Sequence, residues 1–234
     1  MAVPAKLLKL AGHTLVFATP DGKPGRADLR MATGKDLGLL KSVLMADHNG
    51  VTAYRELECS PEFQNPIRWD QMVSKDYDAL LLGGGHAPGM RPYLESSLVQ
   101  QMTVEFSAAG RPIAAICHGT VVAARSISPA TGKSVLWGRK TTSLTWFQEM
   151  LAWNLTRLWL GNYYRTYHHI TVQQEVIACL KNRQDFSPGP VPLRRDTPMD
   201  LKSGFVVQDG NYLSARWPGD AHRFGSEFVK ILQN

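Results

Sequence analysis

The most informative part of the sequence is Pro112-Ile-Ala-Ala-Ile-Cys-His-Gly-Thr120, where an apolar run ends at a cysteine, a histidine and a glycine. An uninterrupted apolar run at 113–116 predicts a strand that is covered on both faces. Gly119 permits a tight turn, and a helical pattern follows over 119–126. This unit predicts that Cys117 stands at the carboxyl edge of a parallel sheet, where open α/β folds place their ligands.

Short apolar runs alternate with longer helical patterns along the rest of the chain, which is typical of a mostly parallel sheet covered by helices on both faces. Further strands are expected at 14–18, 79–82, 140–144, 205–207 and 212–214. Further helices are expected at 5–11, 35–46, 52–57, 93–109, 146–160, 171–181 and 221–232. We therefore predict an α/β fold with a single domain over residues 1–234, in which 146–200 is a helical, aromatic-rich insert ending in a Pro-rich loop.

The charge distribution, the length of the apolar runs and the cysteine spacing indicate which partners and which compartment to expect. The chain has 26 Lys and Arg against 20 Asp and Glu but no long basic run, so no nucleic-acid partner is expected. No stretch approaches the roughly 20 apolar residues that span a bilayer, so no membrane partner is expected either. Cys59, Cys117 and Cys179 are widely spaced and form no Cys-x-x-Cys pair, which favours a reducing, cytoplasmic compartment.

Cys117 is the candidate nucleophile. The N–H groups and dipole at the start of the following helix favour an anion, so we expect the pKa of the thiol to fall below its ordinary value of about 8.5. His118 can act as the general base if its ring turns toward the thiol. The alternative is a buried and inert cysteine, which is the commonest role of an isolated cysteine.

The run Gly83-Gly84-Gly85-His86 follows the expected strand 79–82. Because glycines carry no side chain, this loop can approach Cys117 closely. Backbone N–H groups of Gly85 and His118 can then form an oxyanion hole. The alternative is a plain turn. A phosphate-binding loop is less favoured, because no Gly-Lys-Ser/Thr follows.

Two segments together resemble the ThiJ/PfpI superfamily, within the class I glutamine amidotransferase-like fold. They are Tyr77-Asp-Ala-Leu-Leu-Leu-Gly-Gly-Gly-His-Ala-Pro-Gly89 and Ala115-Ile-Cys-His-Gly119. The segment Asp209-Gly-Asn-Tyr-Leu-Ser-Ala-Arg-Trp-Pro-Gly219 is similar to that group's last strand and turn. The loop Ala18-Thr-Pro-Asp-Gly-Lys23 looks like the larger chaperone and glyoxalase III branch, so the resemblance covers nearly the whole chain.

The resemblance implies a flavodoxin-like sandwich, a homodimer, and a cysteine enzyme that needs no cofactor. Activities attributed to the group include glyoxalase, deglycase, peptidase-like hydrolase, hydratase and holding-chaperone functions. The matching residues are Cys117 as nucleophile, His118 as its neighbour, and Gly84, Gly85 and His86 as the oxyanion and substrate loop.

One part of the family pattern has no counterpart in this sequence. In this group the first strand ends at an acidic residue, which hydrogen-bonds the cysteine and acts as acid and base, just before a segment resembling Val-Ala-Val-Pro. The sequence opens with Met1-Ala-Val-Pro4, so the usual first strand and its acid are expected to be missing or supplied from elsewhere. A sheet without that strand leaves unpaired backbone groups on its neighbours.

A few acidic residues are candidates to replace the missing acid. Asp21 follows the expected strand 14–18 and can reach the same sheet edge, although turn chemistry in Pro-Asp-Gly is the simpler interpretation. Glu149 follows the expected strand 140–144, with a solvated helix position as the alternative. Asp220 follows the last strand and is expected to cap the final helix instead.

Aromatic residues concentrate in one part of the chain: Trp146, Phe147, Trp153, Trp159, Tyr163, Tyr164 and Tyr167. Helix packing or a dimer interface explains them, and the functional alternative is a lid over Cys117 in which Trp146 contacts a bulky substrate. Arg91 and Arg216 are either surface residues or binders of a substrate carboxylate. The histidines lack the spacing of metal ligands, so no metal site is expected.

The leading hypothesis is a cofactor-independent, hydrolase- or lyase-like enzyme that attacks a small carbonyl-containing substrate through Cys117. The alternative is a non-catalytic chaperone or redox-sensing relative that has lost the acid. An amidotransferase-type glutaminase is less favoured, because that class needs a distant His-x-Glu pair, which the C-terminal third does not contain.

Overall fold

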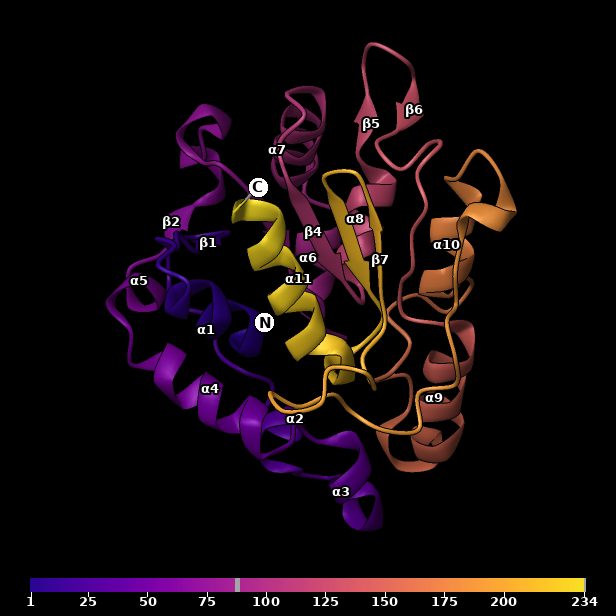
Figure 1. Ribbon diagram of the computed structural model, residues 1–234. Coiled ribbons are helices and arrows are strands. Elements are labelled where there is room, and N and C mark those ends of the chain that lie inside the picture. Colours follow the sequence, from indigo (N-terminus) through magenta and orange to yellow (C-terminus); the bar gives the residue numbers. More distant parts are fainter. Residues whose placement is uncertain (87–88, 234) are drawn as a thin grey trace.

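A four-stranded sheet forms the centre of the computed structural model, which describes residues 1–86 and 89–233 (Figure 1). Its strands, in spatial order, are β3 (Leu80–Leu82), β4 (Ile113–Ile116), β8 (Tyr212–Ala215) and β7 (Val206–Asp209). The first three run parallel, and β7 is antiparallel to β8 at the edge. This confirms the mixed α/β fold with a mostly parallel sheet.

Two small sheets lie apart from the central one. Strand β1 (Ala18–Thr19) pairs in parallel with β2 (Ile67–Arg68), and β5 (Ile127–Ser128) forms a hairpin with β6 (Lys133–Ser134). The expected strand at 14–18 is therefore reduced to its last residue and does not join the central sheet.

The strand expected at 140–144 is wrong. Thr141 makes an isolated bridge to Phe186, and this segment is not part of a named strand. Its apolar and hydroxyl side chains are buried, as a strand's would be. Backbone hydrogen bonds join Thr141 to Asp185 and Ser187, while the contact with β8 is made through side chains. The N–H of Thr142 donates to Ser214 Oγ at 2.9 Å, in place of a ladder bond to the backbone of β8.

Helices surround the sheet. They are α1 (Ala2–Leu10), α2 (Leu29–Thr33), α3 (Lys41–Leu44), α4 (His48–Glu58), α5 (Pro61–Gln64), α6 (Met90–Leu94), α7 (Ser97–Ala108), α8 (Gly119–Arg125), α9 (Trp146–Leu160), α10 (Val172–Ala178) and α11 (Ala221–Gln233). Short 3-10 helices are η1 (Gly38–Leu40), η2 (Trp69–Gln71), η3 (Ser74–Asp76), η4 (Arg183–Asp185) and η5 (Pro218–Asp220). None of the helices in the described ranges is long and apolar enough to cross a membrane.

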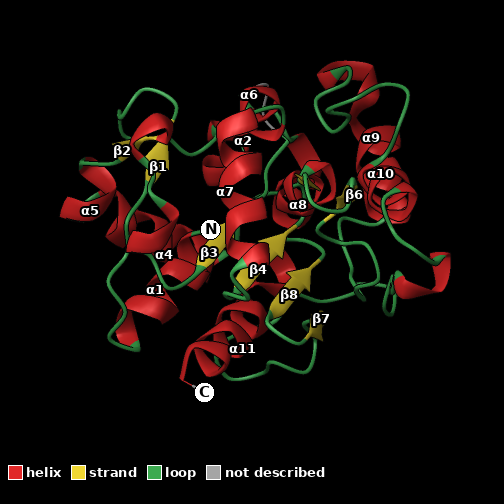
Figure 2. Ribbon diagram, turned by 90° about the horizontal axis from the view of Figure 1, so that it is seen from above, coloured by secondary structure: helices red, strands yellow, loops and turns green. Residues whose placement is uncertain are grey.

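The helices cover the two faces of the sheet as the alternating pattern predicts. Helix α11 packs on β8 with α1 beside it, and α7 and α8 lie on the opposite face (Figure 2). Val99, Met102 and Phe106 of α7 recur at helical spacing and are buried, which gives this helix one apolar side. Phe224 and Phe228 do the same for α11.

Local capping explains where several helices begin. The expected helix 93–109 is broken before Ser97, because the Ser96 side chain accepts a hydrogen bond from the N–H of Val99 and so starts a new helix. At α9 the Thr145 and Gln148 side chains form a reciprocal capping box, which places the start of the helix at the expected residue.

Candidate active site

Cys117 sits on a sharp turn between β4 and α8. Its φ is +58°, a left-handed conformation that residues other than glycine rarely adopt. The turn is fixed on both sides, because the N–H of Cys117 donates to Ala215 O at 3.0 Å and the Thr120 hydroxyl donates to Cys117 O at 2.7 Å. A strained residue held in this way is typical of a functional position, as at the nucleophile elbow of hydrolases.

Two glycines allow the loop after β3 to lie against this turn. A Cβ at Gly84 would stand 2.6 Å from both Cys117 Cβ and Ile116 O. A Cβ at Gly119 would stand 2.3 Å from Leu82 O. Gly84 thus contacts the elbow directly, whereas the α-carbon of Gly85 faces Met90.

His118 is fully buried and its ring lies between the thiol and a threonine. Nδ1 is 3.5 Å from Cys117 Sγ, and Nε2 is 3.0 Å from Thr166 Oγ1. If the Nε2–H donates to Thr166, the lone pair of Nδ1 faces the thiol. Arg91 holds this threonine in place by donating to its carbonyl from Nε and Nη2, at 2.9 and 2.6 Å.

Sequence reasoning missed Thr166, and it considered Arg91 only as a surface or carboxylate-binding residue. Nothing in the local pattern around 166 marks it, because the segment meets His118 only through the tertiary fold. The guanidinium of Arg91 instead donates its hydrogen bonds to the backbone carbonyl of Thr166. Arg91 therefore positions the threonine that contacts His118.

Burial keeps both members of the thiol–imidazole pair neutral. It raises the pKa of Cys117 to about 12, against a smaller lowering by the backbone N–H of His118. It lowers the pKa of His118 to about 3. The lowered thiol pKa expected from the helix N-terminus is therefore wrong, because the loss of water around the thiolate outweighs the favourable N–H groups.

His86 and two tyrosines extend the site away from the thiol. The ring centre of His86 lies 6.1 Å from that of His118, 4.6 Å from Tyr164 and 5.2 Å from Tyr163. Burial lowers the pKa of His86 to about 4, so this imidazole is neutral at pH 7 as well. The Tyr163 hydroxyl donates to Asp28 Oδ2 at 2.8 Å.

Asp21 is not part of the site. Its side chain is exposed and forms an ion pair with Lys23 at 3.4 Å. The backbone N–H of Lys23 also donates to its carboxylate, and this hydrogen bond is the main cause of the lowered pKa of Asp21. Its position follows from the topology, since β1 belongs to the small sheet with β2 and does not reach the edge that carries Cys117.

Glu149 is buried, so the solvated position considered for it is wrong. One carboxylate oxygen accepts the N–H of Val172 at 2.9 Å, at the start of α10, and the other lies 3.4 Å from Arg165 Nε. Burial raises the pKa of Glu149 to about 7. Its charge also raises the pKa of Cys117, but no hydrogen bond joins the two side chains among the described residues.

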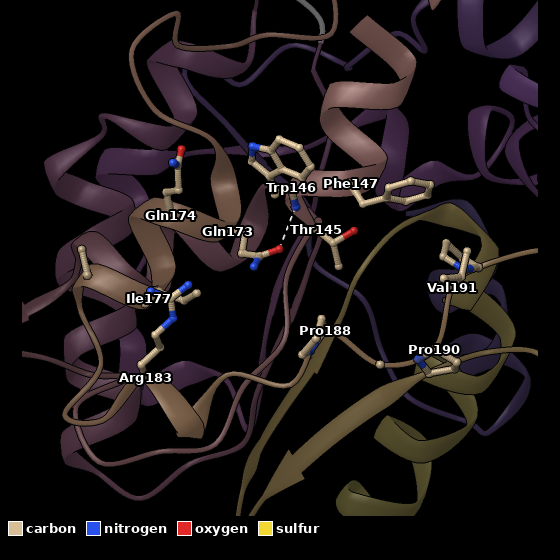
Figure 3. Close-up of a pocket in the computed structure, with 13 residues that line it drawn as sticks. Thr145, Trp146, Phe147, Gln173, Gln174, Ile177, Arg183, Pro188, Pro190 and Val191 are labelled. Atoms are coloured by element: carbon tan, nitrogen blue, oxygen red, sulfur yellow. Dashed lines mark hydrogen bonds between the residues drawn. The ribbon is translucent and has the colours of Figure 1, made fainter. Parts of the chain in front are cut away.

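Trp146 lines a different hollow. Its side chain is half exposed, and its backbone N–H donates to Gln173 Oε1 at 2.7 Å (Figure 3). The hollow has a volume of about 640 Å³ and lies between the starts of α9 and α10 and the Pro-rich loop that includes Pro188 and Pro190. Cys117 is not among the residues that line it. Of the aromatic cluster, it is Tyr163 and Tyr164 that contact the site through His86.

Arg216 is not available to a substrate. It is fully buried and binds Asp220 through Nε and Nη2, at 3.0 and 2.9 Å. Asp220 also accepts the N–H groups of Phe205 and Arg216, so the expected cap of the final helix is wrong. That cap is Asp196, which accepts the N–H groups of His222 and Arg223 at the start of α11.

Comparisons with known proteins identify relatives of this chain. A family model described as ThiJ/PfpI family-like matches residues 1–190. The chain is similar to the deglycase PfpI of Pyrococcus furiosus, with 28% identity over 167 residues that cover 71% of this chain and 69% of that protein. It is 26% identical to the glutathione-independent glyoxalase hsp3102 of Schizosaccharomyces pombe over 61% of this chain and 57% of that protein.

Solved structures support the same fold. The glyoxalase III of Candida albicans superimposes with a TM-score of 0.70 and 18% identity, covering 98% of this chain and 84% of that one. A flavodoxin-like architecture of this kind, the Gly-Gly-Gly-His loop and the cysteine elbow occur together here, and the family model covers most of the sequence. The chain therefore belongs to the ThiJ/PfpI family.

Proposed function

We propose that the protein is a cofactor-independent enzyme in which Cys117 attacks a small carbonyl-containing substrate. The observation that carries this proposal is the cysteine on a positive-φ elbow, with the neutral ring of His118 3.5 Å from its sulfur. The relatives named deglycase and glyoxalase support enzymatic activity in the family.

The geometry supports a simple first step. The Sγ–C bond forms as His118 Nδ1 accepts the thiol proton, and the carbonyl oxygen takes the electron pair of its double bond, which gives a hemithioacetal oxyanion. Because the resting thiol is neutral, the proton leaves only as the substrate is attacked. Backbone N–H groups of Gly85 and His118 are the proposed donors to the oxyanion.

A substitution at the sulfur tests the proposal. We expect Cys117→Ala to lose at least about a thousandfold in turnover of methylglyoxal and related dicarbonyls, because the nucleophile is absent. Its thermal unfolding should stay cooperative. Cys59→Ser is the matched control, because Cys59 is exposed, and it should keep full activity. Undiminished turnover by Cys117→Ala would overturn the proposal.

A second function, a holding chaperone without catalysis, is favoured by one feature. The α9 residues Phe147, Leu151, Leu155 and Leu158 are exposed by 47, 46, 46 and 91%, and unfolded clients bind such apolar surfaces. Client protection that is the same in the parent and in Cys117→Ala, with no turnover by either protein, would support this reading instead.

A further inference from the structure

The imidazole of His118 meets a hydrogen-bonding group at each of its two nitrogens. Nδ1 lies 3.5 Å from Cys117 Sγ, and Nε2 lies 3.0 Å from Thr166 Oγ1. His118 is fully buried and Thr166 is only 8% exposed, so little water competes for either contact. Burial lowers the pKa of His118 to about 3, so the ring carries a single proton at pH 7. The nitrogen that holds this proton decides what the ring can do for the thiol.

The proton of the neutral ring can sit on either nitrogen. With the proton on Nε2, the ring donates to the Thr166 hydroxyl, and the lone pair of Nδ1 accepts the S–H of Cys117. With the proton on Nδ1, that N–H faces the sulfur, which is a weak acceptor, and the thiol proton has no acceptor in the ring. A buried N–H without a good acceptor costs free energy. The first arrangement gives the N–H, the lone pair and the thiol each a partner, so the geometry favours a proton on Nε2.

The Thr166 hydroxyl is carried by a segment, residues 165–168, that belongs to no helix or strand in the described structure. Three consecutive carbonyls of this segment accept hydrogen bonds from guanidinium groups. Arg91 Nε and Nη2 donate to Thr166 O at 2.9 and 2.6 Å. Arg165 Nη2 donates to Tyr167 O at 3.2 Å and to His168 O at 2.8 Å. Charged donors form stronger hydrogen bonds than neutral ones, so the backbone around the threonine is held firmly without a regular element.

Both arginines are themselves fixed by neighbouring side chains. The guanidinium carbon of Arg91 lies 5.1 Å from the centre of the Tyr167 ring, within the range of a cation–π contact. The side chain of Arg165 is only 11% exposed, and its Nε lies 3.4 Å from the buried carboxylate of Glu149. The position of the Thr166 hydroxyl is therefore set from two helices, α6, which carries Arg91, and α9, which carries Glu149.

We propose that Thr166 is a positioning residue whose hydroxyl accepts the Nε2–H of His118 and so leaves the lone pair of Nδ1 facing the Cys117 thiol. The proposal rests on the proposed function, because the base that Thr166 positions is the one that takes the thiol proton. As the S–C bond forms, this proton moves from Sγ to Nδ1. Nδ1 then gives it to the oxyanion, which restores the neutral ring. The hydrogen bond from Nε2–H to Thr166 persists throughout and keeps the ring in one orientation.

The nitrogen NMR spectrum of the imidazole ring tests this proposal without any turnover. In a neutral ring the nitrogen that carries the proton and the bare nitrogen resonate far apart, so the spectrum identifies the tautomer directly. The protein is labelled with nitrogen-15, and the ring signals of His118 are assigned through bonds from its own backbone at pH 7. We expect Nε2 to carry the proton and Nδ1 to be bare. A proton on Nδ1 in the parent protein would overturn the proposal, and this result needs no variant.

Substitutions at Thr166 separate the effect of the hydroxyl from that of the side chain's size. Thr166→Val keeps the size and removes the hydroxyl, so the two nitrogen signals should move toward each other as both tautomers become populated. Thr166→Ser keeps the hydroxyl and should retain the parent spectrum. Thr103→Val is the matched control, because Thr103 is buried in α7 and its hydroxyl donates to Val99 O at 2.8 Å. A parent-like spectrum of His118 in folded Thr166→Val would contradict the proposal.

Kinetic measurements extend the test to the reaction and separate this proposal from the proposed function. With methylglyoxal, Thr166→Val should lower kcat about tenfold, the size expected for one hydrogen bond, and leave KM within about twofold. Thr166→Ser should recover most of this loss, and Thr103→Val should show none. If Thr166→Val shifts the tautomer but Cys117→Ala still turns over substrate, the positioning of His118 stands and the catalytic role of Cys117 falls. If Cys117→Ala is inactive and Thr166→Val keeps the parent kcat, the nucleophile stands and the role of Thr166 falls.

Discussion

Burial sets the chemistry of the individual side chains in this site. Cys117 stands at the start of a helix, where the backbone favours a thiolate, yet its pKa is raised because little water reaches the sulfur. The same loss of water lowers the pKa of His118, so the pair is neutral at pH 7 and does not form the ion pair of many cysteine enzymes. Proton transfer between them is therefore expected to accompany the attack on substrate.

Glu149 gives a prediction for the pH dependence of stability. Its pKa in the folded protein is raised from 4.5 to about 7, so folding favours the protonated carboxyl. The stability that the neutral carboxyl contributes is present below about pH 4.5 and is lost as the pH rises through about 7. Glu149→Gln keeps an acceptor for the Val172 N–H and does not ionise, so it should gain about 3 kcal/mol over the parent between pH 4.5 and 8.

Urea denaturation of both proteins at these two pH values checks this expectation. The comparison between the two proteins cancels the contributions of other groups, such as Asp196, whose pKa burial also raises to about 7. Parallel pH dependences in the parent and in Glu149→Gln would show that the carboxyl does not titrate in this range.

At the scale of elements, the close approach of helix α8 to strand β3 depends on Gly119. A Cβ at Gly119 would lie 2.3 Å from Leu82 O and 2.7 Å from Gly83 O, and the backbone of β3 cannot move aside easily because it is hydrogen-bonded to β4. Gly119→Ala should therefore reduce the free energy of unfolding by about 1–3 kcal/mol, measured in urea. It should also displace the loop that contacts Cys117.

Gly89→Ala is the matched control. A Cβ at Gly89 meets nothing within 4 Å, and its φ of −70° suits any residue. This variant should change stability by less than about 0.5 kcal/mol. Equal losses in the two variants would mean that the close approach of α8 to β3 is not what Gly119 provides.

At the scale of the whole molecule, helix α9 presents an apolar face outward. Phe147, Leu151, Leu155 and Leu158 share one side at helical spacing and are each at least 46% exposed. We propose that this face pairs with the same face of a second copy in a homodimer. A twofold axis can bring this apolar stripe against the same stripe of a second copy. The stripe carries no charged residue that would favour a different partner.

The oligomeric state tests this proposal. Multi-angle light scattering should find a dimer for the parent and a monomer for the Leu155→Glu and Leu158→Glu double variant at micromolar concentration. Leu10→Glu alters an equally accessible leucine, 74% exposed at the end of α1, and should remain dimeric. A dimer that persists in the double variant would place the interface elsewhere, and a monomeric parent would exclude the proposal.

The local elements and the elbow were predictable because the signals that define them are short in sequence. The apolar run 113–116 forms β4, the capping box at Thr145 starts α9, and the Asp209-Gly210-Asn211 turn joins β7 to β8. The family resemblance likewise rested on short motifs, at 77–89, 115–119 and 209–219, and the family model confirms it. In each case the residues that interact are neighbours along the chain, so their pattern carries the information.

The identity of the groups around Cys117 was decided by tertiary structure alone. Thr166 contacts His118, and Arg91 donates to the carbonyl of Thr166. The residues of each pair are far apart in the sequence, so no local pattern predicts either contact. Asp21 lies outside the site because the strand before it belongs to a different sheet. Arg216 cannot bind a substrate because it is paired with the buried Asp220. The physical reason is desolvation: whether a side chain is charged, paired or available depends on which distant segments exclude water from it, and composition and spacing do not specify that.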